Sequence, residues 1–190
     1  MDKDKNNLNL EIDALVIRLQ QDDKEAFSDF YNLLVKQLYR YLFFSVDKHD
    51  IDDLIAVIFI KVWEKIKFYQ VKGDASFKSW FFRLAKNTVI DFYRSSKVVY
   101  ELKDFLPDNS EKNDPYQNTK EKLMQEKLKK CLDKLNENYR EFLTLKFLGE
   151  FSNKEIAEIL KKNESSLRVL QFRALVALKK IIEEEGGIDF

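Results

Sequence analysis

Apolar residues recur at spacings of three and four along most of the chain, which is the period of a helix with one buried face. The repeat runs through residues 23–46, returns in residues 50–68 and occurs a third time in residues 77–97. In the first segment it falls on Phe27, Phe30, Tyr31, Leu34, Leu38 and Leu42. The alternation with a period of two that would indicate strands is absent from the sequence. The pattern therefore predicts an all-α protein.

Residues 77–97 show the most distinctive pattern, because rings gather on one face and cations on the other. At about 100° per residue, the apolar side holds Phe77, Phe81, Leu84, Ala85, Thr88, Val89 and Phe92. The other side holds Arg83, Lys86, Asn87, Arg94 and Lys97, and a turn around Gly73 precedes the segment. This predicts an amphipathic helix with a cationic outer face. An ordinary core helix whose solvent face is basic would give the same pattern.

The C-terminal third shows a short capped helix followed by a longer basic one. Ser152 and Glu155 have the spacing of a reciprocal capping box, and Gly149 and Asn163 supply breaks on either side of that helix. The longer helix is expected to bury Leu167, Leu170, Ala174, Leu178 and Ile181, and to expose Arg168, Val169, Phe172, Arg173 and Lys180. Two such helices joined by a tight turn are a helix-turn-helix candidate, whose second helix would enter the major groove of DNA.

Residues 98–120 separate the two helical regions. They contain both prolines of the chain, Pro107 and Pro115, with little periodicity. Within them, residues 100–116 carry five acidic side chains against two lysines, whereas residues 78–97 carry five cations and one acid. The sequence thus predicts two small helical domains, residues 8–97 and 121–185, joined by a flexible acidic linker over 98–120.

Composition narrows the chemistry that these domains can perform. The chain of 190 residues has a formal net charge of +0, so tight binding to nucleic acid by charge alone is not expected. Cys131 and His49 are the only residues of their kinds, which leaves almost nothing for zinc sites, disulfides or histidine-based catalysis. We expect no metal, no cofactor and no enzymatic activity. The charged start of the chain and the lack of a long apolar run predict a cytoplasmic location without a membrane span.

Two motifs resemble those of bacterial RNA polymerase sigma factors of the extracytoplasmic-function (ECF) group. "DIDDLIAVIFIKVWEKI" and "GDASFKSWFFRLAKNTVIDFYR" are similar to region 2 of that family, and "LNENYREFLTLKFLGEFSNKEIAEILKKNESSLRVLQFRALVALKK" is similar to region 4. The resemblance covers nearly all of the chain apart from its ends and the linker. It implies a factor that directs core RNA polymerase to promoters and promotes DNA melting for transcription initiation. The acidic linker would thread into the basic channel of the polymerase, and an anti-sigma factor is a further candidate partner.

The resemblance places the minus-ten interface on residues 73–97. Region 2 of the family holds this promoter element as single strands open, and stacking on rings contributes about 1–3 kcal/mol per base whatever the sequence. By position, the loop that pockets a flipped base is Gly73, Asp74, Ser76, Phe77 and Ser79, and the helix face that reads and anchors the element is Asn87, Asp91 and Arg94. The remaining expected contributors are Trp80, Arg83, Lys86 and Lys97. Phe77 shares the apolar stripe and is expected in the core, whereas Trp80 fits either role.

The resemblance also implies that region 4 binds the minus-thirty-five element as a duplex. The expected contact residues are Ser165, Ser166, Arg168, Val169, Phe172, Arg173 and Lys180. The serines would take phosphates, the arginines phosphate or guanine, and Val169 and Phe172 thymine methyl groups. The family usually carries more polar residues at the positions of Val169 and Leu170. The resemblance therefore implies which helix contacts the bases more directly than it implies which chemical groups make the contacts.

The helix in residues 50–68 is expected to hold a coiled coil of the polymerase core. Its expected contact residues are Asp53, Val57, Ile60, Lys61 and Glu64. The family commonly has a Gln and an acidic residue where this chain has Ala56 and Val57, so the contact would be more apolar here. After the reading helix, "RSSK" is less basic than is usual, which should weaken affinity for the DNA backbone.

Three other functions are compatible with parts of the sequence. A helix-turn-helix regulator that acts without polymerase would explain the C-terminal domain but not the aromatic and cationic segment 77–97. A hydrolase-like enzyme could hold a metal on Asp50, Asp52 and Asp53, yet no second acidic cluster completes the ligand set. A helical adaptor would fit the unusual Ala56 and Val57.

Overall fold

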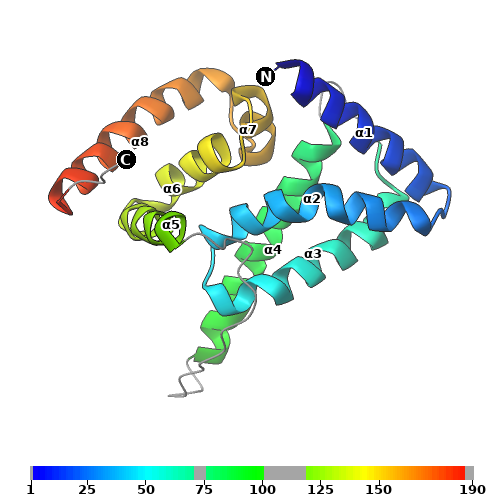
Figure 1. Cartoon of the computed structure of the whole chain (residues 1–190), viewed down its shortest axis with the longest axis horizontal. Coiled ribbons are helices and arrows are strands. Elements are labelled where there is room, and N and C mark those ends of the chain that lie inside the picture. Colours follow the sequence, from blue (N-terminus) through cyan, green and yellow to red (C-terminus); the bar gives the residue numbers. More distant parts are fainter. Residues whose placement is uncertain (1, 71–75, 101–118, 187–190) are drawn as a thin grey trace.

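The computed structural model describes residues 2–70, 76–100 and 119–186, and within these ranges all regular structure is helical (Figure 1). The elements are α1 (Asp2–Gln20), α2 (Glu25–Phe43), η1 (Lys48–Asp50), α3 (Ile51–Ile66), α4 (Phe77–Tyr100), α5 (Thr119–Asp133), α6 (Glu137–Leu143), η2 (Thr144–Leu148), α7 (Asn153–Leu160) and α8 (Glu164–Glu184). The predicted all-α class is confirmed. None of the helices in these ranges combines the length and the apolar content needed to cross a membrane.

Helices α1 to α4 form the N-terminal lobe around a cluster of aromatic rings. The Phe30 ring of α2 meets the rings of Phe59, Phe77 and Phe81 at centroid distances of 6.0, 5.6 and 6.2 Å, each close to edge-on. Such geometry suits the ring quadrupoles and adds about 0.5–1.5 kcal/mol per pair to the burial itself. All four rings are buried, and the predicted apolar face of α4 lies in the core, with Phe92 at its edge. The predicted orientation of this helix is therefore confirmed.

Helix α1 precedes the three segments, residues 23–46, 50–68 and 77–97, in which the sequence shows a helical repeat of apolar residues. Its buried side chains are Ile12, Leu15, Val16 and Leu19, at helical spacing, and it packs on α2 and α4. Gln20 at its end donates hydrogen bonds to the carbonyls of Ile66 (2.9 Å) and Tyr69 (2.8 Å), where α3 ends. Helix α1 thereby fixes the point from which the chain leaves α3 towards α4.

Helices α5 to α8 form the C-terminal lobe. The predicted capping box is present, since Ser152 Oγ accepts from the Glu155 N–H (3.2 Å) and the Glu155 carboxylate accepts from the Ser152 N–H (2.8 Å). Asn163 caps α8 by accepting from the Ser166 N–H at 2.8 Å. The buried side of α8 carries Leu167 and Ala174, with partly buried Leu170, Leu178 and Ile181, as predicted.

The π-helical turn η2 ends at Gly149, where the backbone passes very close to its neighbours. A Cβ atom on Gly149 would lie 2.6 Å from the Phe151 ring and 2.9 Å from the Leu145 carbonyl oxygen. No other residue fits without moving one of these groups. Gly149 thus lets the chain turn from η2 into α7 while Phe151 points inward.

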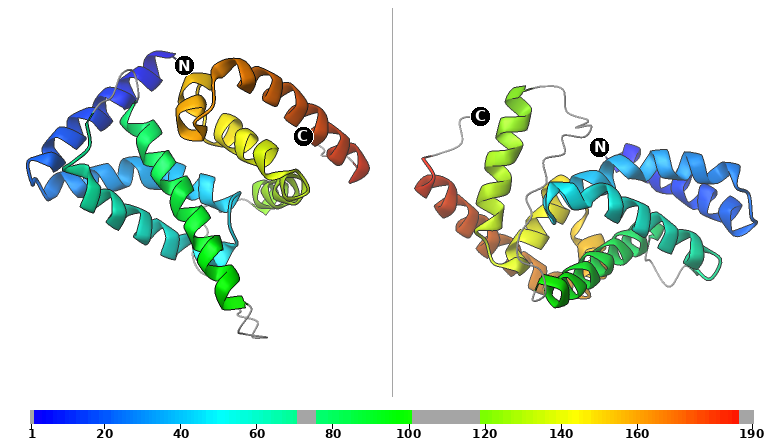
Figure 2. Two further views of the ribbon diagram at one scale, coloured as in Figure 1. Left: turned by 180° about the vertical axis from the view of Figure 1, so that it is seen from behind. Right: turned by 90° about the horizontal axis from the view of Figure 1, so that it is seen from below.

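The two lobes pack against each other, with α7 lying on α4 (Figure 2). The Phe151 ring is 4.7 Å from the Phe82 ring of α4, and the Lys78 ammonium sits 4.5 Å above the same ring. Lys78 is buried by this contact, although it lies in the cationic segment. The predicted linker 98–120 lies mostly outside the described residues, because α4 extends to Tyr100 and α5 begins at Thr119. The domain limits remain predictions.

Candidate nucleic-acid and polymerase interfaces

The side chain of Ser76 caps the N-terminus of α4. Its Oγ accepts from the Ser79 N–H at 3.1 Å and lies 3.0 Å from the Ser79 hydroxyl, so it caps the first turn. Phe77 is 1% exposed and belongs to the aromatic core, as the sequence suggested. Gly73, Asp74 and the side chain of Lys97 lie outside the described part of the chain.

Trp80 and Arg83, one turn into α4, line a cavity of about 450 Å³. The Trp80 ring packs on Phe77 (5.1 Å) and Tyr69 (5.2 Å), and the residue also forms part of the cavity wall, so a contact with the minus-ten strand remains a prediction. The wall also includes Ser79 and, from α7 of the other lobe, Glu158. Sequence reasoning did not identify Tyr69 or Glu158 as parts of this site.

Further along α4, Asn87, Asp91 and Arg94 are exposed on one side of the helix. Asp91 lies 3.9 Å from Lys61, whose ammonium also donates to Thr88 Oγ1 at 3.2 Å. Lys61 therefore joins α3 to α4, although the sequence placed it on the outward face of α3.

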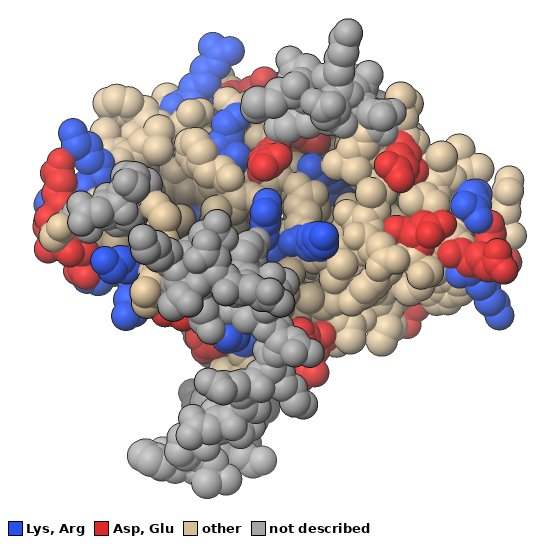
Figure 3. Space-filling model, in the orientation of Figure 1, with Lys and Arg blue, Asp and Glu red and all other residues tan. Residues whose placement is uncertain are grey.

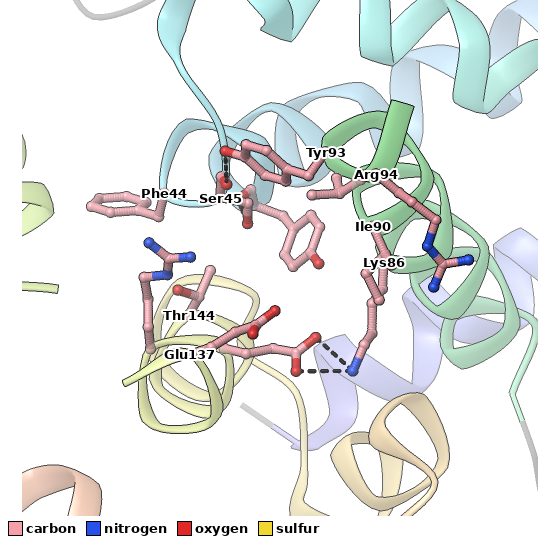
Figure 4. Close-up of a pocket in the computed structure, with 12 residues that line it drawn as sticks. Phe44, Ser45, Lys86, Ile90, Tyr93, Arg94, Glu137 and Thr144 are labelled. Atoms are coloured by element: carbon pink, nitrogen blue, oxygen red, sulfur yellow. Dashed lines mark hydrogen bonds and ion pairs between the residues drawn. The ribbon is translucent and has the colours of Figure 1, made fainter. Parts of the chain in front are cut away.

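Lys86 differs from the expectation of a solvent-facing cation, because the C-terminal lobe covers it. Its ammonium lies 2.8 Å from the Glu141 carboxylate of α6, and both side chains are about one-fifth exposed (Figure 4). Burial raises the pKa of the Glu141 carboxyl above its ordinary value, and the Lys86 ammonium only partly opposes this shift. The pair closes one side of an interlobe cavity of about 290 Å³, whose wall includes Ser45, Ile90, Tyr93 and Thr144.

The outward face of α8 combines cations with exposed apolar side chains. Arg168 and Arg173 form no ion pair with any described residue, and Val169 and Phe172 are 52% and 70% exposed. The hydroxyls of Ser165 and Ser166 bond to Asn163 at the helix start, and Lys180 lies 3.8 Å from Glu184. Leu175 and Val176 continue the exposed apolar surface by one turn. Because Leu175 and Val176 follow Phe172 by three and four residues, the helical period already places them on the same face of α8.

The outward face of α3 is also partly apolar. Val57 and Ile60 are 41% and 58% exposed, which confirms the exposure predicted for them, and Asp53 and Glu64 are exposed beside them. Trp63 and, from α2, Tyr31 add partly exposed rings that the sequence did not assign to this surface. The structure therefore widens the apolar surface expected for α3.

A cluster of two aspartates and a histidine lies at the start of α3, and it differs from the three aspartates that the sequence suggested as metal ligands. Asp47, His49 and Asp50 bring one ligand atom each to within 4.8 Å of one another, whereas the sequence suggested Asp50, Asp52 and Asp53. Two of the three are exposed, and surface groups of this kind are common without an ion. Elsewhere on the surface both signs of charge are interspersed, with several basic side chains near the centre of the face in Figure 3.

Comparison with known proteins assigns the two lobes. The model of sigma-70 region 2 matches residues 26–99, and the model of sigma-70 region 4 matches residues 125–178. SigZ of Bacillus subtilis, an RNA polymerase sigma factor, is 30% identical over 140 residues, which are 72% of this chain and 75% of that protein. BldN of Streptomyces coelicolor, an ECF RNA polymerase sigma factor, is 29% identical over 175 residues, 90% of this chain and 66% of that protein.

Solved structures agree with this assignment at the level of the fold. CnrH in complex with the cytosolic domain of CnrY matches 90% of this chain and 96% of that chain, with a TM-score of 0.67 and 19% identity. The sigma factor RpoE of Bartonella quintana, in complex with the anti-sigma factor NepR, matches 82% and 97%, with a TM-score of 0.62 and 22% identity. The matches to regions 2 and 4 and to the sigma factors SigZ and BldN define the class, a transcription initiation factor. The chain belongs to the ECF RNA polymerase sigma factors, which are not enzymes, and it directs RNA polymerase to promoters.

Proposed function

We propose that the three surfaces described above divide the work of initiation. The outward face of α8 reads the minus-thirty-five element, the exposed side of α4 with the Trp80 cavity takes the opened minus-ten strand, and the outward face of α3 holds the polymerase core. The observation that carries this assignment is a pair of guanidinium groups, without an ion pair to any described residue, beside exposed apolar side chains on a capped helix. Such a helix offers both phosphate contacts and base-edge contacts to a major groove.

Each surface has a chemistry suited to its target. Arg168 and Arg173 can form charge-assisted hydrogen bonds with phosphate or guanine, and Phe172 can pack on thymine methyl groups. On α4, exposed Asn87 offers an amide to an unpaired base, and Arg94 offers a charge to the backbone. On α3, Val57 and Ile60 would be buried by the polymerase, which favours an apolar partner helix.

Two further assignments belong to the same proposal. The chain acts in the cytoplasm, because its targets are the polymerase and the chromosome. An anti-sigma factor is its regulatory partner, which is supported by the similarity of its fold to sigma factors solved with such partners. In this role a partner would withhold the sigma factor from the polymerase until a signal releases it.

Site-directed DNA cleavage tests the placement of both DNA surfaces directly. In a Cys131→Ser background, an iron chelate is attached to Ser165→Cys on α8 or to Ser95→Cys on α4, both exposed positions. The reconstituted holoenzyme should cut promoter DNA near minus thirty-five with the first probe and near minus ten with the second. A probe on exposed Ser28→Cys of α2 is the matched control and should cut neither element. Absent or exchanged cleavage positions would contradict the assignment.

A further inference from the structure

We propose that the cavity beside Tyr93 binds a guanine nucleotide, with the base inside and the phosphate at the mouth. The cavity lies between α4 and the end of α2 on one side and α6 on the other (Figure 4). Its volume of about 290 Å³ is close to the lower limit for small-molecule pockets, about 300–1,000 Å³. Binding at this site does not depend on the DNA contacts proposed above for α4 and α8.

One wall of the cavity is apolar and only partly covered by the protein. Ile90 and Tyr93 of α4 line it and are 37% and 41% exposed, while Tyr41 and Phe44 contribute buried rings. The Tyr93 hydroxyl donates to the Ser45 carbonyl at 3.0 Å, which holds the ring in one orientation. A flat ring that enters the cavity would cover this apolar surface and find an aromatic side chain already in place. The wall therefore favours a planar aromatic ligand.

Two charged side chains of the cavity wall lack an ionic partner. Glu137 of α6 and Arg94 of α4 both line the cavity from facing elements, and neither forms an ion pair with any described residue (Figure 4). The other charged groups of the wall are already paired, Lys86 with Glu141 at 2.8 Å and Arg140 with Asp133 at 3.2 Å. A matching ligand therefore offers hydrogen-bond donors to a carboxylate at one end and an anion to a guanidinium at the other.

Guanine suits the Glu137 carboxylate better than the other bases do. Its N1–H and its N2 amino group are adjacent donors, and the two oxygens of a carboxylate can accept from both. Adenine instead presents the acceptor nitrogen N1 beside its amino group, so one carboxylate oxygen would meet a lone pair. The phosphate of the same nucleotide would bind Arg94, since a guanidinium forms paired, charge-assisted hydrogen bonds with phosphate oxygens. One ligand thus satisfies the aromatic wall, the carboxylate and the cation.

Calorimetric titration of the full chain with three matched ligands tests the proposal. The ligands are guanosine 5′-monophosphate, adenosine 5′-monophosphate and guanosine. The wild-type chain should bind guanosine monophosphate at least about tenfold more tightly than adenosine monophosphate, because adenine leaves the carboxylate without its second donor. It should also bind guanosine monophosphate about tenfold more tightly than guanosine, which lacks the anion.

Two variants separate recognition of the base from recognition of the phosphate. Glu137→Gln should bring the affinities for the two monophosphates together, because an amide can both donate and accept. Arg94→Gln should lower the affinity for guanosine monophosphate to that for guanosine and leave the latter unchanged. Glu126→Gln and Lys127→Gln make the same charge changes at exposed residues of α5 outside the cavity, and both should bind like the wild type.

A third variant tests whether the nucleotide occupies the cavity. Ile90→Trp fills the space from a partly exposed position and should abolish binding, with the circular dichroism spectrum unchanged. Asn87→Ala alters the exposed side of the same helix and should leave nucleotide binding unchanged. Equal affinities for the two monophosphates in the wild type, or binding retained by Ile90→Trp, would overturn the proposal. Loss of binding in Asn87→Ala would also overturn it, because the nucleotide would then lie on the minus-ten surface. These titrations contain neither polymerase nor promoter, so their failure would leave the cleavage test above unaffected.

Discussion

Val169 and Phe172 place apolar groups on the outward face of α8, where they are 52% and 70% exposed. Exposed apolar groups on such a helix favour thymine, whose methyl group lies in the major groove. Replacing a contacted thymine with uracil should weaken binding of the holoenzyme by about 0.8 kcal/mol, or about fourfold, since one methyl group is lost. Phe172→Ala should abolish this sensitivity, whereas Lys180→Ala should retain it. Equal sensitivity to uracil in the wild type and in Phe172→Ala would show that the ring does not contact the methyl group.

Ser76 has two separable roles, because it caps α4 and also belongs to the predicted base-pocket loop. Ser76→Ala should lower the free energy of unfolding by about 1 kcal/mol, since the Ser79 N–H loses its acceptor. Ser76→Asn should keep most of the stability, because Asn is an equally good N-cap residue. Thermal unfolding followed by circular dichroism measures both. Opening of the promoter by the Asn variant then reports on the loop without the loss of the cap.

The exposed apolar side chains of α3 lead to a prediction about binding of the polymerase core. Val57→Glu combined with Ile60→Lys should reduce association with core polymerase at least about tenfold, because two apolar contacts are replaced by charges that the interface would bury. Helical content should stay unchanged, since both side chains are exposed. Asp52→Lys with Lys65→Glu alters exposed charges elsewhere on the same helix and serves as the control. Normal binding by the first double variant would place the core interface elsewhere.

The junction between η2 and α7 predicts a loss of stability from a single methyl group. Gly149→Ala should lower the free energy of unfolding by about 1–3 kcal/mol, because the new Cβ would overlap the Phe151 ring and the Leu145 carbonyl. Ala on the exposed Asn138 of α6 is a suitable control. Denaturant titration should show a lower midpoint for the glycine variant alone. An unchanged midpoint would mean that Phe151 can shift without cost.

The helices and their buried faces could be predicted from the sequence because each is a local pattern. The stripe from Phe77 to Phe92, the capping box at Ser152 and the exposed side of α8 all follow from spacing within one helix. Helix α1 does not stand out in the sequence, since its apolar spacing covers only residues 12–19 and follows a charged start. The capping role of Ser76 is also a local signal, since a serine directly before the first apolar residue of a helix is typical of an N-cap.

The packing of the two lobes against each other could not be predicted from the sequence, nor could the identity of the surface residues that each lobe covers on the other. Lys78, Lys86 and Glu158 look like ordinary exposed residues in their own helices, and their burial or pairing depends on contacts between segments far apart in the chain. The same limit applies to the interlobe cavity beside Tyr93. With a net charge of +0, the chain has little long-range attraction for DNA, so we expect promoter binding to depend on the polymerase.

The division of labour between the two lobes is the central claim, and one comparison tests it most directly. Holoenzymes carrying Arg173→Ala or Asn87→Ala are bound to a fully paired promoter and to the same promoter with the minus-ten segment mismatched. Recruitment is measured by titration, and opening by permanganate reactivity of unpaired thymines. Arg173→Ala should weaken recruitment to both templates by about 1–3 kcal/mol, since its contact is with duplex DNA.

Asn87→Ala should leave recruitment to the paired promoter nearly unchanged and reduce its opening. The mismatched template should restore part of the loss, because the unpairing cost of a few kcal/mol has already been supplied. If both variants showed the same defect on both templates, the two lobes would not act on separate steps, and the proposed division of labour would be contradicted.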